Sequence, residues 1–449
     1  MKVPLSPPGT DQLMKRVSPD QFRRLFAMPP TQQGRYLHWD EVRHRVPPAK
    51  LSHEDWWLGI KMARRSLMKS LPLLDKHDRP ICFASPDPVL KALHEIDRQA
   101  AGEIAMERQV VSGEDRDRYL VSSLIEEAIT SSQLEGASTT REKARDMLRS
   151  GRQPRDRSER MVLNNYHAMD LIRRLKDERF TPERILELHS IVTDGTLDKP
   201  DAAGRFRRSD ERISVMDATH TVVLHAPPEA ESLPERLTRL CNFANQEPGE
   251  EPFVHPVIRA IIVHFMLGYD HPFVDGNGRT ARALFYWSVA RSGYWLMEYL
   301  SISRLLLKAP AQYARAYLHT ETDENDATYF ILHQLAIIQK AIAALHQYLD
   351  RKVREQRSAE HLLRQSAGMA DQLNHRQVAL LSHALRHPGH GYTVKSHERS
   401  HRVTTQTSRT DLLKLAELKL LEQRKRGRKF VFYAPLDLDE RIKATTRTN

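Results

Sequence analysis

The sequence predicts a mainly α-helical protein that contains one small β-hairpin and ends in a separate compact unit. Apolar residues recur at the three- and four-residue spacing of amphipathic helices along most of the chain. Two-residue alternation, the pattern of a half-buried strand, occurs around a turn near residues 213–225. A change of composition near residue 374 marks the start of the separate unit.

The length of 449 residues is enough for two to four domains. A strongly charged stretch precedes the C-terminal unit and is expected to be a solvated helical connector. We expect an N-terminal helical region at residues 1–105, a helical core at 106–350, the charged connector at 351–372, the compact unit at 373–436 and a tail at 437–449.

Composition and charge limit the classes of protein. Lysine and arginine total 69 against 58 aspartates and glutamates, a net charge of +11 that favours polyanionic partners without proving them. Cys82 and Cys241 lie far apart and have no partners at metal-ligand spacing, which excludes a disulfide scaffold and suits a reducing compartment. No apolar run reaches the roughly 18–20 residues of a membrane span, and the N-terminus lacks the apolar segment of a signal peptide. We expect a soluble, cytoplasmic protein with no membrane partner.

Residues 271–282 are the stretch on which the functional prediction depends: His-Pro-Phe-Val-Asp-Gly-Asn-Gly-Arg-Thr-Ala-Arg. Apolar residues at helical spacing lead into this stretch from Val257 to Phe265. A second apolar helix leaves it and is expected to stop at Gly293. The stretch is therefore expected to be a turn between two buried helices, at the N-terminus of the second.

The turn is suited to binding an anion. The first amides of a helix lack intrahelical partners and carry the positive end of its dipole. Gly276 and Gly278 leave room for a phosphate to lie against those amides. Arg279 and Arg282 are three residues apart, so they share a helix face and can hold a polyphosphate with two guanidinium groups.

The same turn carries an acid–base group and a metal ligand. His271 can take a proton near neutral pH, and Asp275 offers the hard oxygen that Mg²⁺ prefers. Each feature has a commoner structural explanation when taken singly, since a Gly-Asn-Gly is most often a turn and a helix-face arginine is usually solvated. His271 and Asp275 would also suit a metal hydrolase, but no further His or carboxylate cluster follows at ligand spacing. Together, the residues favour phosphoryl or nucleotidyl transfer.

Residues 271–282 resemble the core motif of the Fic (filamentation induced by cAMP) family, His-Pro-Phe-x-Asp-Gly-Asn-Gly-Arg-x-x-Arg, at every defined position. The resemblance implies a helical Fic core and a protein adenylyltransferase, which moves AMP from ATP to a hydroxyl side chain (Ser, Thr or Tyr) of a target protein. It implies that His271 deprotonates the target hydroxyl and that Asp275 holds Mg²⁺ between the α- and β-phosphates of ATP.

The resemblance also assigns the remaining motif residues. Asn277, with the amides around Gly276 and Gly278, would steady the α-phosphate. Arg279 would hold the β-phosphate, and Arg282 would pair with the γ-phosphate.

A second stretch, the helix expected at about residues 117–136, carries Ser131 and Glu135 on one face, and Gly136 suits its C′ position. A carboxylate in the last turn of a helix faces the negative end of the dipole, which is unfavourable by a few tenths to about 1 kcal/mol. An arginine partner would offset this, although a solvated glutamate at a frayed end explains the local pattern as well. Ser131-x-x-x-Glu135-Gly136 resembles the inhibitory-helix motif of many Fic proteins. That resemblance implies that Glu135 pairs with Arg282, denies it to the γ-phosphate, and makes the enzyme autoinhibited.

The hairpin expected near residues 213–225 is a candidate for docking the target protein. In Fic proteins a flap at this place aligns the backbone of the target, and an edge strand can capture a peptide by strand addition. Ile213, Val215 and Val222 are the candidate docking residues.

The C-terminal unit resembles a winged helix-turn-helix with a basic wing. Three predicted helices are followed by two strands around a run of lysines and arginines. Gln406, Ser408 and Arg409 would face DNA from the recognition helix, and Arg424 and Arg426 would contact phosphates from the wing. The alternative is that the same module docks on the Fic core or on a partner protein.

Two alternatives to an ATP- and Mg²⁺-dependent adenylyltransferase stay open. A DNA-binding regulator that only senses nucleotide would not need a base, so the intact His271 argues against it. A Fic-type enzyme could also transfer phosphate, or remove AMP with Glu135 orienting a water molecule. A homodimer that regulates the inhibitory helix is compatible with the sequence.

Overall fold

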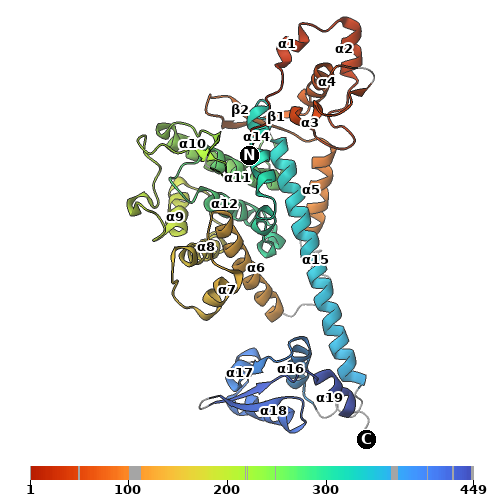
Figure 1. Ribbon diagram of the computed structural model, residues 1–449, viewed down its shortest axis with the longest axis vertical. Coiled ribbons are helices and arrows are strands. Elements are labelled where there is room, and N and C mark those ends of the chain that lie inside the picture. The colour runs from red at the N-terminus through yellow and green to blue at the C-terminus, as the bar shows by residue number, and fades with distance from the viewer. Residues whose placement is uncertain are drawn as a thin grey trace. The chain divides into compact units, whose positions relative to one another are not determined.

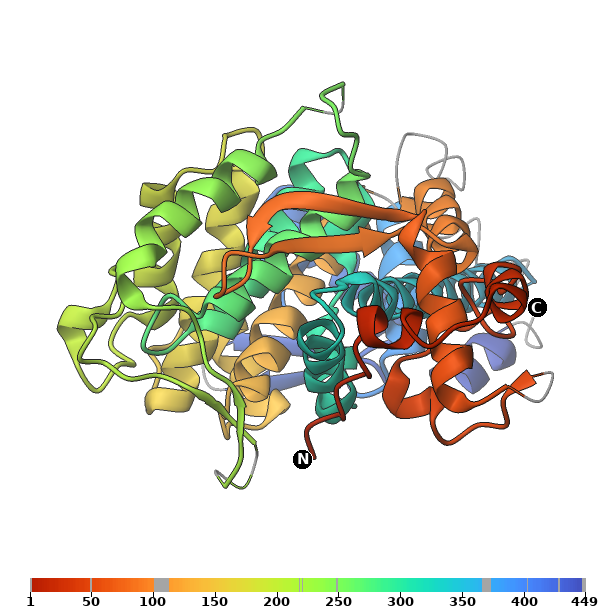
Figure 2. The same cartoon turned by 90° about the horizontal axis from the view of Figure 1, so that it is seen from above.

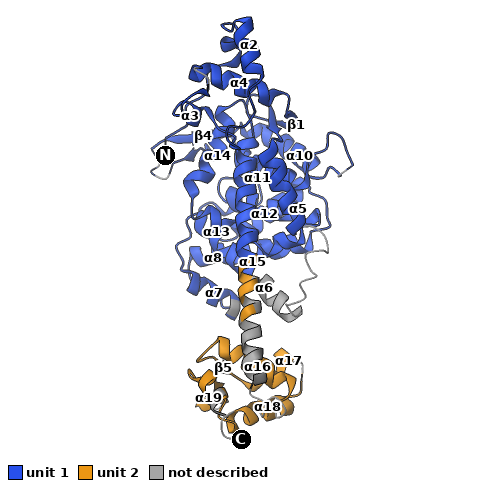
Figure 3. Ribbon diagram, turned by 90° about the vertical axis from the view of Figure 1, so that its right-hand side faces the viewer, with its two compact units in different colours: residues 1–345 blue, residues 346–449 orange. Residues whose placement is uncertain are grey.

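The computed structural model describes residues 2–48, 51–100, 113–365, 373–426 and 429–445, apart from the single residues 218, 220, 248 and 402. The chain divides into two compact units, residues 1–345 and residues 346–449 (Figures 1 and 3). Helices dominate both units, as the sequence predicts.

The first unit is built from many helices and two small hairpins. Its helices are α1 (Thr10–Met14), α2 (Pro19–Phe26), α3 (Trp39–Val42), α4 (His53–Arg65), α5 (Asp87–Ala100), α6 (Gly113–Leu134), α7 (Arg141–Ser150), α8 (Arg157–Arg174), α9 (Pro182–Thr193), α10 (Leu233–Ala244), α11 (Pro256–Asp270), α12 (Asn277–Arg291), α13 (Ser303–Leu306), α14 (Pro310–Thr322) and the start of α15 (Thr328–Gln365). Its strands are β1 (Met68–Leu74), β2 (Pro80–Ala84), β3 (Val215–Met216) and β4 (Val223–His225).

Helices α11 and α12 form the centre of the first unit and pack against each other, with α6, α8, α9 and α10 around them (Figure 1). Both are buried on nearly every face, which explains why apolar residues occur around their whole circumference. The indole of Trp287 on α12 stacks on Phe180 at 4.0 Å and donates a hydrogen bond to the Leu175 carbonyl at 2.8 Å. The turn between α11 and α12 is therefore held by two helices that cannot shift without opening the core.

The hairpin β1–β2 is absent from the sequence prediction, which expected only helices before residue 105. The two antiparallel strands pair Met68 with Ala84 and Leu74 with Pro80 (Figure 2), and β1 packs against α10. Leu71 and Leu73 on β1 are buried, as are Ile81, Phe83 and Ala84 on β2. Each strand contains a proline, and the alternation of buried and exposed residues is short. For these two reasons the sequence pattern did not predict the hairpin.

The second hairpin, β3–β4, lies where it was predicted but is shorter. Val215 pairs with His225, and Met216 pairs with Val223. Ile213 precedes β3, and Val222, 38% exposed, precedes β4, so two of the three predicted docking residues lie just outside the paired strands. The role of all three in docking stays a prediction.

The second unit contains the end of α15, α16 (His375–Arg386), α17 (Val394–His401), α18 (Thr405–Glu417) and α19 (Leu438–Thr445), with strands β5 (Gly391–Tyr392), β6 (Glu422–Arg426) and β7 (Lys429–Tyr433). The strands form an antiparallel sheet of order β5–β7–β6. Thr404 caps α18 by accepting a hydrogen bond from the Thr407 amide. Three helices, α16 to α18, are followed by the two strands β6 and β7 in the predicted order, with the short strand β5 added between α16 and α17; the winged helix-turn-helix stays a prediction.

The predicted DNA-contact residues fall in different environments. Gln406 and Arg409 are exposed on α18, and Arg424 is exposed on β6. Ser408 is fully buried, so its side chain cannot reach DNA and the prediction for it is wrong. It lies one residue from Arg409, and this 100° step around the helix turns it toward the apolar core. The side chain of Arg426 lies outside the described part of the chain.

One segment of α15, Thr328–Tyr348, is long and apolar enough to cross a membrane. Polar residues interrupt its apolar residues, so the segment contains no uninterrupted apolar run of that length. Within this segment, 61% of the most apolar window is buried inside the protein. Phe330, Ile331 and Ile338 belong to that buried face. A core helix of a soluble domain has the same length and composition, and the burial favours that interpretation.

Candidate functional site

The catalytic candidate His271 lies at the end of α11 in a left-handed backbone conformation. Its φ is +45°, and its amide donates to the Leu267 carbonyl at 3.1 Å. For a residue with a Cβ, this conformation costs roughly 1–2 kcal/mol. Arg207 stabilises it from outside, because its Nε donates to the His271 carbonyl at 2.9 Å and its amide donates to the Pro272 carbonyl at 2.9 Å. The sequence did not identify this role for Arg207.

The imidazole of His271 is prepared to act as a base. Its Nδ1 lies 3.2 Å from the Gly268 carbonyl, an acceptor, so Nδ1 carries the proton and Nε2 keeps its lone pair. Burial is the main cause that holds the pKa of His271 below its ordinary value. At neutral pH the ring is therefore neutral and able to accept a proton at Nε2.

A second histidine, His189 on α9, shapes the turn. Its ring stacks on Phe273 at 3.7 Å, its Nε2 donates to the Asp275 carbonyl at 2.9 Å, and its Nδ1 accepts from the Gly204 amide at 3.0 Å. Burial lowers the pKa of His189 to about 4, which agrees with this neutral form. Sequence reasoning missed His189, since a lone histidine on an apolar helix carries no signal of the loop it contacts.

Asn277 braces the turn with its side chain. Its Oδ1 accepts from the Phe273 amide at 3.0 Å, and its Nδ2 donates to the Phe273 carbonyl at 2.7 Å. Since both ends of the carboxamide are used inside the loop, the structure gives this side chain a positioning role. The contact of Asn277 with the α-phosphate stays a prediction. The backbone amides of the first turn of α12, which lack intrahelical partners, can donate hydrogen bonds to that phosphate.

Neighbouring atoms leave no room for a side chain at the two glycines of the motif. Gly276 has φ +82°, and a Cβ there would lie 2.7 Å from the Thr193 methyl group. A Cβ at Gly278 would lie 2.1 Å from Glu135 Oε1 and 3.0 Å from Arg282 Nη1. The carboxylate of Glu135 therefore lies directly against the glycine at the N-terminus of α12, where the sequence predicts an anion.

Arg279 is an inward-facing cation with unused donors. Its side chain is fully buried, and Nη1 donates to the Val192 carbonyl at 2.9 Å. Its Nε and Nη2 have no hydrogen-bond partner among the described residues, and Nη2 lies 3.7 Å from Asp275 Oδ1. Leaving buried charged donors unsatisfied costs about 1–3 kcal/mol or more. A phosphate at this place would satisfy them, so the site fits the polyphosphate that the motif predicts.

Arg282 is paired with the last turn of α6. Its Nε donates to Ser131 Oγ at 2.9 Å, and its Nη2 donates to the Ser131 carbonyl at 3.0 Å and to Glu135 Oε1 at 2.9 Å. The guanidinium is 1% exposed, whereas the Glu135 side chain is 27% exposed. This is the pairing expected from the inhibitory-helix motif, and it places all three residues in one contact.

Helix α6 is also fixed by Glu127, two turns before Glu135, which sequence reasoning did not identify. The buried carboxylate of Glu127 accepts hydrogen bonds from Ser301 Oγ at 2.9 Å, from the Ser303 amide at 3.1 Å and from Ser303 Oγ. Burial raises the pKa of Glu127. The charge of Arg282 also acts on Glu127, but the hydrogen bonds of Glu127 go to Ser301 and Ser303, so α6 is attached to the first unit through hydrogen bonds separate from the Glu135 pair.

Asp275 is the residue that could hold a divalent cation. Its side chain is 43% exposed, and its Oδ1 accepts from the Gly276 amide at 2.5 Å. No cluster of three or more His, Cys or carboxylate ligands occurs among the described residues. Mg²⁺ commonly uses one or two carboxylates together with substrate phosphates, so a single accessible carboxylate beside a phosphate site fits this ion.

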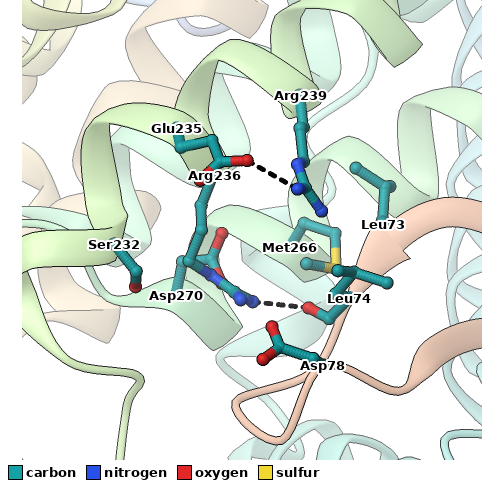
Figure 4. A pocket seen from close by; sticks show the side chains of 9 residues that line it. All are labelled: Leu73, Leu74, Asp78, Ser232, Glu235, Arg236, Arg239, Met266 and Asp270. Carbon is teal, nitrogen blue, oxygen red and sulfur yellow. Dashed lines mark hydrogen bonds and ion pairs between the residues drawn. The ribbon is translucent and has the colours of Figure 1, made fainter.

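Behind the turn, Asp270 joins the C-terminal end of α11 to α10. Arg236 Nε donates to Asp270 Oδ1 at 2.8 Å, and Arg236 Nη2 donates to the Leu74 carbonyl at 2.5 Å (Figure 4). Burial raises the pKa of Asp270 to about 6. The cavity of about 60 Å³ at this place is too small for a nucleotide, and its contacts support the residue next to His271.

Comparisons with known proteins agree with this geometry. Residues 179–289, from α9 to α12, match the sequence model of the Fic/DOC family. The chain contains a Fic domain. The similar curated proteins are named protein adenylyltransferase Fic: that of Nematostella vectensis is 34% identical over 119 residues, 26% of this chain and 25% of the relative. That of Drosophila mojavensis is 37% identical over 114 residues, 25% of this chain and 20% of the relative.

The matched regions thus span about a quarter of the length of these curated relatives. Solved structures similar to the Fic domain and its surroundings include a Fic family protein from Desulfovibrio desulfuricans, 18% identical, covering 78% of this chain and 97% of that chain with a TM-score of 0.49. Fic-1 from C. elegans is 22% identical and covers 58% of this chain and 73% of that chain, with a TM-score of 0.44.

Proposed function

We propose that the Fic domain is a protein adenylyltransferase that transfers AMP from ATP to a hydroxyl group of a target protein. The observation that carries the proposal is the neutral, half-buried His271 next to a glycine-lined helix N-terminus and the two unsatisfied nitrogens of Arg279, Nε and Nη2. The names of the curated relatives support the same activity.

In the proposed reaction, His271 Nε2 takes the proton of the target hydroxyl, whose oxygen attacks the α-phosphorus of ATP. The new oxygen–phosphorus bond forms as the bond between the α-phosphorus and its bridging oxygen breaks, and pyrophosphate leaves. The first amides of α12 and the guanidinium of Arg279 face the developing negative charge. Asp275 would hold Mg²⁺, which neutralises phosphate charge when bound.

The contact between Glu135 and Arg282 supports autoinhibition. A carboxylate already lies against Gly278 and is hydrogen-bonded to Arg282, so a γ-phosphate would have to displace a like-charged group. We infer that the described structure is the inhibited form. The target would dock near β3–β4, where Val222 and Val223 are 38% and 52% exposed.

Labelled ATP tests the reaction. The full chain and its Glu135→Gly variant are incubated with a candidate target and with ATP labelled at either the α- or the γ-phosphate. We expect protein-bound label from the α-position alone. Label from the γ-position would show phosphate transfer, and no transfer of either label would favour a nucleotide sensor. Loss of label from a pre-modified target would show AMP removal.

We also propose that the second unit is a winged helix-turn-helix that binds DNA. Exposed Gln406 and Arg409 on α18 and the basic hairpin β6–β7 support this role. Binding of the full chain to duplex DNA, measured by fluorescence anisotropy, should weaken at least about 10-fold between 50 and 200 mM salt. Arg409→Ala and Arg424→Ala should weaken it further, whereas Arg174→Ala in the Fic domain should not. Binding that is unaffected by both salt and these variants would contradict the proposal.

A further inference from the structure

A cavity lined by arginines opens beside the motif loop, at the N-terminus of α8. Its volume is about 330 Å³. Its walls come from the start of α8 and from the segment after α9: Pro154, Arg155, Asp156, Arg157, Arg160, Gly195, Thr196, Leu197 and Asp198. Neither the motif nor the inhibitory helix contributes a residue to this wall, so the roles assigned above leave the cavity without a function.

Arg157 connects the cavity to the proposed metal ligand. Its Nη2 lies 3.8 Å from Asp275 Oδ2, and its Nη1 lies 2.9 Å from Asp198 Oδ1. The side chain of Asp198 is 89% exposed. Exposed ion pairs contribute only about 0–1 kcal/mol, so a multiply charged anion can replace Asp198 as the partner of Arg157.

A second arginine lies one turn further along the same helix face. Arg160 Nη1 is 3.7 Å from Asp194 Oδ2, whose side chain is 71% exposed, so this ion pair is also weak. The N-terminus of α8 adds the positive end of the helix dipole, with its third amide, that of Glu159, already bonded to Asp156 Oδ1 at 2.8 Å. Two arginine forks and a helix N-terminus on one wall suit phosphate groups, which accept several hydrogen bonds at once.

Glu135 blocks the extension of a bound polyphosphate toward Arg282. A polyphosphate bound at Asp275 could extend toward Arg282, but Glu135 holds that guanidinium and its Oε1 would lie 2.1 Å from a Cβ at Gly278. Extension past Arg157 meets Arg155, Arg157 and Arg160, together with the exposed carboxylate of Asp198 and that of Asp156, whose Oδ1 accepts from the Glu159 amide at 2.8 Å. Three arginines against two aspartates leave this wall with a net positive charge, which favours the end of a polyphosphate chain in the cavity while Glu135 is in place.

We propose that the cavity of Arg157 and Arg160 is a subsite for condensed phosphate. It takes the terminal phosphates of ATP while Glu135 holds Arg282, and it takes pyrophosphate on release. The subsite deepens the proposed adenylyl transfer and rests on it, because that reaction is what places a polyphosphate at Asp275.

Direct binding tests the subsite without any measurement of transfer. Isothermal titration calorimetry with sodium pyrophosphate, without divalent metal, is performed on the full-length wild type and on three variants. Arg157→Gln should weaken binding about 10-fold. Asp198→Asn, which removes the competing carboxylate, should strengthen it about 2- to 5-fold. Arg174→Gln, at the other end of α8 and about 25 Å away along the helix axis, should leave the dissociation constant unchanged.

Arg157→Gln and Asp198→Asn are expected to change binding in opposite directions, so a folding defect cannot imitate the expected pattern. Asp198 is nearly fully exposed, so its replacement leaves the core unchanged. Wild type that binds no pyrophosphate at millimolar concentration would overturn the subsite, and so would equal affinity in wild type, Arg157→Gln and Asp198→Asn. Failure of the labelled-ATP experiment with these binding shifts intact would refute the proposed transfer and leave a condensed-phosphate site. Transfer of AMP without the binding shifts would refute the subsite alone.

Discussion

Glu135→Gly is expected to raise AMP transfer, measured as self-modification with α-labelled ATP, about 10- to 100-fold above wild type. The variant removes the carboxylate that lies against Gly278 and accepts a hydrogen bond from Arg282. A buried guanidinium that has lost its carboxylate partner is stabilised strongly by a new anion. Truncating one side of such a buried pair typically changes the binding free energy by about 2–5 kcal/mol. The γ-phosphate then becomes the natural partner of Arg282.

Two controls separate removal of the carboxylate from damage to α6. Gln133→Gly introduces the same backbone freedom two residues earlier and should stay at the wild-type rate, because Gln133 bonds the Thr139 carbonyl and not Arg282. Glu135→Gln keeps the size of the side chain but removes its charge, so it should raise the rate by less than the glycine variant. If neither Glu135 variant exceeds wild type, the ion pair does not inhibit transfer.

Activation does not require α6 to leave the domain. The hydrogen bonds of Glu127 with Ser301 and Ser303 hold the helix two turns away from Glu135. The Glu135 side chain is 27% exposed, so it can swing toward solvent while Glu127 stays buried. If the proposed inhibition operates, an activator needs to shift only one side chain or the last turn of α6, which takes less free energy than removing a helix from the core.

Residues 271–282 could be predicted in detail because their chemistry is local. The turn glycines, the helix N-terminus and the spacing of Arg279 and Arg282 follow from neighbouring positions in the chain. His189, Arg207 and Glu127 could not be predicted, because each meets its partner only after residues 64 to 176 positions apart come together. No local periodicity encodes such a contact.

Errors in the fold prediction have the same origin. Ser408 was assigned to the DNA-facing side of α18 from its place in the first turn, but only packing decides which side of a short helix is buried. The β1–β2 hairpin was missed because its strands are short and contain prolines, while the burial that stabilises them comes from α10. In both cases tertiary contacts decided what the local pattern left open.

His271→Ala is expected to lower AMP transfer by about 10²- to 10⁴-fold, the usual contribution of a general base. The measurement is the rate of labelling from α-labelled ATP in the Glu135→Gly background, where the rate is high enough to follow a large loss. Nucleotide binding should persist, since the first amides of α12, Arg279 and Arg282 are unchanged. His167→Ala, which alters an exposed histidine on α8, is the matched control and should keep the full rate.

The pH profile distinguishes a base from a residue that only shapes the loop. Burial holds the pKa of His271 below its ordinary value, so the neutral ring with a free Nε2 lone pair persists on mild acidification. The rate of the Glu135→Gly variant should therefore fall only when the pH drops below the ordinary imidazole pKa of about 6.5. In the His271→Ala variant the residual rate should lose this dependence, because no imidazole is left to protonate. A residual rate that keeps the same acid limb would assign the titration to another group, and an unchanged rate would remove His271 from the reaction.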